Sequence, residues 1–136
     1  MIIAVDFDGT IVEHKYPEIG KEIPFATSTL RMLAEQRHQI ILWTVRRGEL
    51  LEEAVEWCRE RGVEFYAVNK NFPEESVDNN GGYCKINAEL FIDDRNLGGI
   101  PDWGTIYKVI TEGKKWSEIY SNSEEVHTKR KKGWFW

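Results

Sequence analysis

The sequence has few of the residues that build metal knuckles, disulfide frameworks or membrane spans. Only two of its 136 residues are cysteines, Cys58 and Cys84, and they are too few and too plainly spaced for a zinc knuckle or a disulfide framework. No apolar run approaches the roughly 20 residues of a membrane span, and no signal-peptide pattern precedes the first apolar segment. We therefore expect a cytoplasmic protein with buried, reduced thiols and no membrane partner.

Basic charge is also scarce. The chain has 18 Lys and Arg against 23 Asp and Glu, a net charge of −5, and four of the basic residues lie together at 129–132. This balance does not indicate a nucleic-acid-binding protein. The exception is the segment 122–136, in which the basic run precedes Trp134, Phe135 and Trp136. Such a segment can bind single-stranded nucleic acid, but docking on this domain or on another subunit is the interpretation we favour.

Short apolar runs alternate with segments of helical periodicity. Buried strands are predicted at 2–5, 40–43, 65–68 and 90–92, and helices at 25–36, 48–61 and 104–120, the last interrupted near Gly113. The first helix has Ala26, Leu30, Leu33 and Ala34 on one face. Residues 11–24 and 69–82 are predicted to be loops. The alternation predicts a three-layer α/β domain with a mostly parallel sheet, spanning residues 1–121, followed by a tail at 122–136.

Polar side chains coincide with the ends of three predicted strands, where open α/β sheets bind ligands. They are Asp6 and Asp8 in the segment Asp-Phe-Asp-Gly-Thr, Thr44, the pair Asp93 and Asp94, and Lys85 in the loop before the last strand. Taken singly, each has a structural explanation, as a helix cap or as a solvated side chain. Taken together they form a phosphoryl-transfer site. Four clustered acids need a divalent cation to neutralise them, which implies Mg²⁺.

These segments resemble the motifs of haloacid dehalogenase (HAD) superfamily phosphatases, from residue 2 to about Trp103. Residues 6–10 match the first motif, 42–44 the second, Lys85 the third and 91–94 the fourth. The resemblance implies a Rossmann-like sheet with strand order 4-1-2-3, a central position for Asp6 and an aspartyl-phosphate intermediate. Lys85 precedes Asp93 more closely than in many members, as in compact members of the superfamily.

The resemblance also implies a role for each residue. Asp6 is the nucleophile, and Asp8 carries a proton to the leaving group and from water. Asp6, Asp94 and the backbone carbonyl of Asp8 bind the metal, and Asp93 is either a further ligand or an acceptor for a metal-bound water. Thr44 and Lys85 hold the non-bridging phosphoryl oxygens. Asp8 disfavours the dehalogenase branch, which lacks a second acid there.

The loops between the motifs are too short for a cap domain of roughly 40 residues. The chain thus resembles capless members, in which a large substrate or another subunit covers the site. His14, Tyr16, Arg46 and Arg47 are the candidate specificity residues near the rim, with a solvated or packed side chain as the alternative for each. We also expect a homo-oligomer whose contact includes the region after Trp103, because aromatic residues are enriched at interfaces.

The sequence therefore predicts a Mg²⁺-dependent phosphomonoester hydrolase acting on a small or larger phosphorylated substrate. A phosphotransferase or mutase with the same covalent intermediate is the first alternative. A signalling module resembling a receiver domain is less favoured, because receivers carry the acidic pair on the first strand and the phospho-acceptor on a later one. A non-catalytic binding protein is disfavoured by the complete set of catalytic groups.

Overall fold

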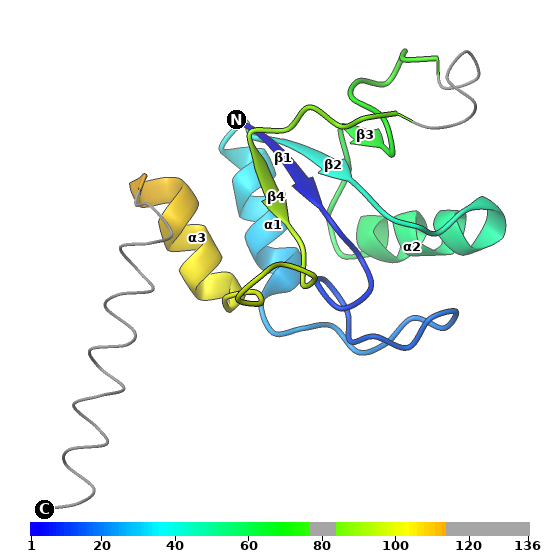
Figure 1. The fold of residues 1–136 in the computed structure, drawn as a ribbon, viewed down its shortest axis with the longest axis horizontal. Helices are drawn as coiled ribbons and strands as arrows, with labels where there is room; N and C mark the ends of the chain where they lie inside the picture. The colour runs from blue at the N-terminus through cyan, green and yellow to red at the C-terminus, as the bar shows by residue number, and fades with distance from the viewer. Residues whose placement is uncertain (77–83, 114–136) are drawn as a thin grey trace, which may run out of the picture. The chain divides into compact units, whose positions relative to one another are not determined.

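The computed structural model describes residues 1–76 and 84–113. The elements are β1 (Ile2–Val5), α1 (Ala26–Glu35), β2 (Gln39–Leu42), α2 (Gly48–Glu60), β3 (Ala67–Val68), β4 (Leu90–Ile92) and α3 (Trp103–Glu112) (Figure 1). The chain divides into two compact units, Met1–Trp103 and Gly104–Trp136. The described residues contain no helix long and apolar enough to span a bilayer. The tail predicted at 122–136 and the boundary at residue 121 lie outside the described residues.

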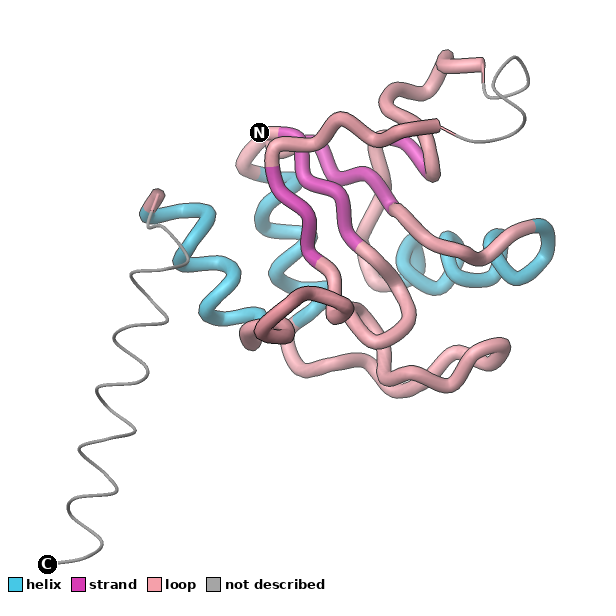
Figure 2. Tube along the Cα trace, viewed as in Figure 1, coloured by secondary structure: helices cyan, strands magenta, loops and turns pink. Residues whose placement is uncertain are grey.

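The four strands form one parallel sheet in the order β3-β2-β1-β4, which confirms the predicted α/β class and strand order. Strand β1 lies between β2 and β4, as Figure 2 shows, and Val5 is in register with both Leu42 and Ile92. The residue after Val5 therefore leaves the sheet near its centre. The third strand is shorter than predicted, because only Ala67 and Val68 pair with β2.

Different segments of the chain cover the two faces of the sheet. Parallel crossovers are right-handed and the chain moves from β1 to β2 to β3 in one direction, so α1 and α2 cover the same face. Ile3, Val5 and Phe7 face these helices, and the Phe7 ring meets the edge of Trp57 in α2 at a centroid distance of 5.8 Å. On the opposite face, Ala4 and Ile41 pack against Ile86, in the segment before β4.

The buried residues of helix α1 match the predicted apolar face except at one position. Ala26, Leu30 and Leu33 are fully buried, but Ala34, which was expected beside them, is exposed. The apolar stripe of α1 is thus narrower than the pattern predicted, and Thr29 takes a buried position instead. Helix α3 ends at Glu112, and Gly113 follows with φ of 66°, in agreement with the predicted interruption. The remainder of the predicted helix lies outside the described residues.

The environments of the two cysteines differ. Cys58 is buried in α2, and its burial raises the pKa of the thiol to about 12. Cys84 is only half-buried, so the prediction of a buried thiol is wrong there. Its Sγ donates to Oε1 of Glu75 at 3.0 Å, in the segment between β3 and β4.

Residues 11–23 belong to the segment 11–24 that was predicted as a loop, and they form a folded segment that we call the flap. The Glu13 N–H donates to the Lys21 carbonyl at 2.7 Å, and the Ile23 N–H donates to the Ile11 carbonyl at 2.8 Å. An isolated antiparallel bridge joins Val12 to Glu22 between these bonds. The two arms of the flap are therefore held together by backbone hydrogen bonds, and its turn lies at about 15–19.

Candidate functional site

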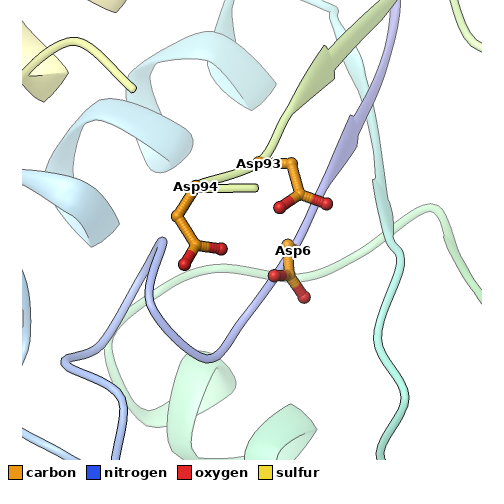
Figure 3. Close-up of side chains that lie close together, drawn as sticks. All are labelled: Asp6, Asp93 and Asp94. Atoms are coloured by element: carbon orange, nitrogen blue, oxygen red, sulfur yellow. The ribbon is translucent and has the colours of Figure 1, made fainter. Parts of the chain in front are cut away.

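Three carboxylates meet at the carboxyl edge of the sheet. Asp6 follows β1, and Asp93 and Asp94 follow β4; each offers one oxygen, and the three oxygens lie within 4.8 Å of one another (Figure 3). The pairing of Val5 with Ile92 brings these strand ends side by side, and the Asp6 N–H donates to the Ile92 carbonyl at 3.0 Å. The parallel register thus assembles the acids that the sequence placed at two separate strand ends.

Burial and the proximity of the other acids change the protonation of Asp6. Burial is the largest effect and raises its pKa, a hydrogen bond from the Phe7 backbone lowers it, and the charges of Asp93, Asp94 and Asp8 raise it again. The result is a pKa of about 7 for Asp6 in the absence of a metal. At neutral pH this cluster is therefore poised to take up a cation in exchange for a proton.

The donor set fits Mg²⁺. This ion binds oxygens at roughly 2.0–2.1 Å in octahedral geometry, which places bound oxygens about 3–4 Å apart. Carboxylate oxygens within 4.8 Å of one another need only small rotations to reach these separations. All three residues are half-buried, so water has access to the remaining coordination positions that Mg²⁺ usually keeps. The Asp8 carboxylate is not part of this cluster.

Gly9 and Thr10 fix the position of Asp94. The Thr10 Oγ1 accepts a hydrogen bond from the Asp94 N–H at 3.1 Å and donates to Oδ1 of Asp94 at 3.4 Å. The Trp103 Nε1–H in turn donates to the Thr10 carbonyl at 3.0 Å. Gly9 has φ of 85°, and a Cβ there would lie 2.4 Å from Oδ2 of Asp94. These two residues of the Asp-Phe-Asp-Gly-Thr segment therefore support the cluster, a role that the sequence analysis did not assign.

Asp8 is paired with a buried arginine. Nε and Nη2 of Arg46 donate to the two carboxylate oxygens of Asp8, each at 2.8 Å, in a bidentate ion pair. The Arg46 side chain is 0% exposed. The hydrogen bonds that Arg46 donates to Asp8 are the main cause that raises the pKa of Arg46 above its ordinary value. The second acid of the segment is thus held apart from the three-carboxylate cluster by its own cation.

Of the two positions that the sequence left open for Arg46, a rim contact and a packed side chain, the structure shows the packed one. Its Nη1 donates to the Pro17 carbonyl at 3.1 Å and its Nη2 to the Glu18 carbonyl at 2.9 Å, both in the turn of the flap. The guanidinium carbon also lies 5.1 Å from the centroid of the Phe7 ring and 5.2 Å from that of Tyr16. The guanidinium donors of Arg46 thus have their partners at Asp8 and in the turn of the flap, and the side chain points into the protein.

Thr44 lies at the end of β2 and is 8% exposed. Its Oγ1 accepts a hydrogen bond from the Arg46 N–H at 3.1 Å, and its N–H donates to Oδ1 of Asn69 at 2.8 Å. The hydroxyl proton of Thr44 is not used in these bonds. Asn69 was missed by the sequence analysis, although its position directly after the third strand was a usable signal.

Lys85 is exposed, and no contact in the structure joins its amine to the carboxylates. Its segment is held by Asn71, whose Nδ2 donates to the Lys85 carbonyl at 3.0 Å and whose Oδ1 accepts from the Asn87 N–H at 2.6 Å. The structure therefore fixes the backbone of this segment but does not bring Lys85 into the cluster. Nothing in the sequence pattern pointed to Asn71.

The remaining candidates lie on the surface. His14, Tyr16 and Arg47 are exposed, the first two on the flap and the third directly before α2. Tyr16 is tied to the site through the contact of its ring with the Arg46 guanidinium. His14 has no such link to Asp8 or to the three carboxylates.

The ion pair yields a stability prediction. Arg46→Met leaves the 7% exposed Asp8 carboxylate without its cation, and we expect the free energy of unfolding to fall by roughly 3–5 kcal/mol. Arg47→Met is the matched control at the next, exposed position, with an expected loss below about 1 kcal/mol. Urea denaturation of the three proteins measures both values. Equal losses in the two variants would contradict the structural importance of the pair.

The raised pKa of Asp6 yields a pH prediction. The folded protein binds the Asp6 proton more tightly than the unfolded chain does, so the stability contributed by the neutral form is present below about pH 4 and is lost as pH rises through about 7. In EDTA, the Tm of the wild type should fall relative to that of Asp6→Asn between about pH 5 and pH 8. Saturating Mg²⁺ should reduce this difference. Parallel pH curves in EDTA would show that Asp6 titrates normally.

Comparisons with known proteins define the relatives of the chain. No family model and no curated protein matches it. A solved structure of a conserved protein from Bacteroides thetaiotaomicron is similar, with 63% sequence identity, a TM-score of 0.80 and coverage of 88% of this chain and 97% of that chain. At that identity and coverage, the chain belongs to the same family as this conserved Bacteroides thetaiotaomicron protein.

Proposed function

We propose that the protein is a Mg²⁺-dependent phosphomonoester hydrolase of the HAD type that acts through an aspartyl-phosphate intermediate. The observation that carries the proposal is the convergence of Asp6, Asp93 and Asp94 at the carboxyl edge of a parallel sheet, with Asp8 held outside the cluster. Two kinds of carboxylate environment at one sheet edge suit two roles, nucleophile and proton carrier. The order of the motifs along the chain supports the same assignment.

Asp6 is the proposed nucleophile. One of its oxygens attacks phosphorus, the bond from phosphorus to the ester oxygen breaks, and the phosphoryl group is transferred to the carboxylate. Mg²⁺ held by Asp6, Asp93 and Asp94 would neutralise the charge of the cluster and of the phosphate. Water then attacks the phosphoryl group, which releases phosphate and restores the Asp6 carboxylate.

Asp8 is the proposed proton carrier. It gives a proton to the leaving oxygen in the first step and takes one from water in the second. Both of its oxygens accept hydrogen bonds from Arg46, and an ionised carboxylate has no proton to donate. Each oxygen keeps a second lone pair that can take up a proton, but a protonated Asp8 would lose the charge that pairs with Arg46, and the two hydrogen bonds would weaken. Because Arg46 also donates to the carbonyls of Pro17 and Glu18, a shift of its guanidinium would affect the turn of the flap as well.

Thr44 and Lys85 are the proposed contacts to the non-bridging oxygens. The Thr44 hydroxyl keeps its proton available, because its bond with the Arg46 N–H uses only an acceptor position. Lys85 belongs to this proposal through the resemblance of the motifs, and its exposed side chain has the freedom to move. A phosphotransferase or mutase would use the same residues and differ only in the acceptor.

The first test is hydrolysis of p-nitrophenyl phosphate. We expect Mg²⁺-dependent turnover that EDTA abolishes, and a loss of at least about 10³-fold in Asp6→Asn, because the amide cannot form the acyl phosphate. Circular dichroism shows whether the variant is folded. Turnover that persists in folded Asp6→Asn would falsify the nucleophile assignment. Release of phosphate with and without an added alcohol separates hydrolysis from phosphotransfer.

The second test separates Asp8 from the metal cluster. We expect Asp8→Asn to lower kcat by about 10²–10⁴-fold, while calorimetric Mg²⁺ affinity changes little, because its carboxylate lies outside the three-carboxylate cluster. Asp94→Asn is the matched comparison and should lose both affinity and activity. If Mg²⁺ affinity falls equally in both variants, the proposed division of roles is wrong. Thermal denaturation checks that the unpaired Arg46 has not unfolded Asp8→Asn.

A further inference from the structure

An aromatic pair lies beside the carboxylate cluster, on the face of the sheet opposite α1 and α2. The rings of Trp43 and Phe91 meet edge to face, with centroids 6.1 Å apart and an interplanar angle of 83°. Their exposed fractions are 37% and 49%, which is high for large apolar side chains that flank a central strand. Neither residue has a role in the proposed chemistry.

Strand register explains why these rings adjoin Asp6. Phe91 is in register with Ala4, and the Trp43 N–H donates to the Val5 carbonyl at 2.8 Å, directly before Asp6. Side chains alternate between the two faces of a strand, so Asp6 shares its face with Ala4. The small Ala4 side chain leaves space on this face of the sheet, next to Phe91 on β4 and to Trp43 directly after β2.

That space is a cavity of about 270 Å³ that is continuous with the carboxylates. It is lined by Trp43 and Phe91 on its apolar side and by Asp6, Asp93 and Asn96 on its polar side. Its volume is slightly below the range of roughly 300–1,000 Å³ that is typical of pockets for drug-sized ligands. A cavity of this size accommodates one ring together with a phosphoryl group.

We propose that Trp43 and Phe91 bind the leaving group of the substrate, and that this leaving group carries an aromatic ring. The inference rests on the proposed function, because it takes Asp6 as the residue that attacks phosphorus. Asp6 and Asp93 line the same cavity as the two rings, so the ester group of a phosphate bound at these acids would have the rings within reach. A flat ring gains stacking or edge contacts there that a short alkyl group cannot make.

Two substrates with alkoxide leaving groups test this preference without a bias from leaving-group reactivity. We compare kcat/KM for 2-phenylethyl phosphate and ethyl phosphate in the full chain with Mg²⁺. The expected ratio in the wild type is about tenfold or more in favour of the aromatic ester, the range that one stacked ring supplies. Trp43→Leu and Phe91→Leu should each reduce this ratio several-fold. Phe72→Leu, at an exposed ring between β3 and β4 that does not line the cavity, is the matched control and should retain it.

The outcomes separate this inference from the proposed function. The aromatic subsite is overturned if both esters are hydrolysed with a kcat/KM ratio near one, or if Trp43→Leu and Phe91→Leu leave the ratio unchanged. In either case the proposal of a hydrolase still stands. Failure of the folded wild type to hydrolyse either ester overturns both. If Trp43→Leu instead converts an oligomer to a monomer in sedimentation experiments and keeps the ratio, the rings form a contact between copies of the chain and the subsite is excluded.

Discussion

The buried guanidinium of Arg46 is the constraint on which the arrangement of the site depends. A charge that is withdrawn from water needs a partner of opposite sign and acceptors for its remaining protons. Asp8 provides the first, and the carbonyls of Pro17 and Glu18 provide the second. One side chain thereby joins the end of β1, the segment between β2 and α2, and the turn of the flap. Removing it would affect three segments, one of which, the flap, lies outside the sheet.

The acids at the sheet edge fall into two electrostatic classes as a result. Asp8 has a cation supplied by the protein, whereas Asp6, Asp93 and Asp94 have none among the described residues. Like charges that are partly withdrawn from water favour either a proton or a metal ion, and the raised pKa of Asp6 expresses this demand. The repulsion among the three carboxylates is unfavourable in the absence of a cation, and the same repulsion favours the binding of a cation such as Mg²⁺.

The sheet supplies both halves of the proposed substrate site from one register. Residues that alternate along β1 place Ala4 and Asp6 on the same face, while Val5 supports the core beneath α1 and α2. Phe91 on β4 and Trp43 directly after β2 extend that face, so an apolar surface continues directly from the Asp6 carboxylate. A site built on paired strands holds its groups more rigidly than one built on loops, which favours a defined orientation of the phosphate and its ester group.

The sequence by itself determined the alternation of strands and helices and the location of Asp6, Asp93 and Asp94 at strand ends, because apolar runs and the residues that follow them are local features. The strand order followed from the resemblance of the motifs rather than from the pattern. The short β3 and the exposure of Ala34 were not predictable, since periodicity does not show how much of a stripe the neighbouring elements cover. Only the tertiary structure decided that Arg46 is buried and that Trp43 adjoins Phe91. Asp8 is 38 residues from Arg46 in the chain, and its pairing depends on how the strand ends and the flap meet in space.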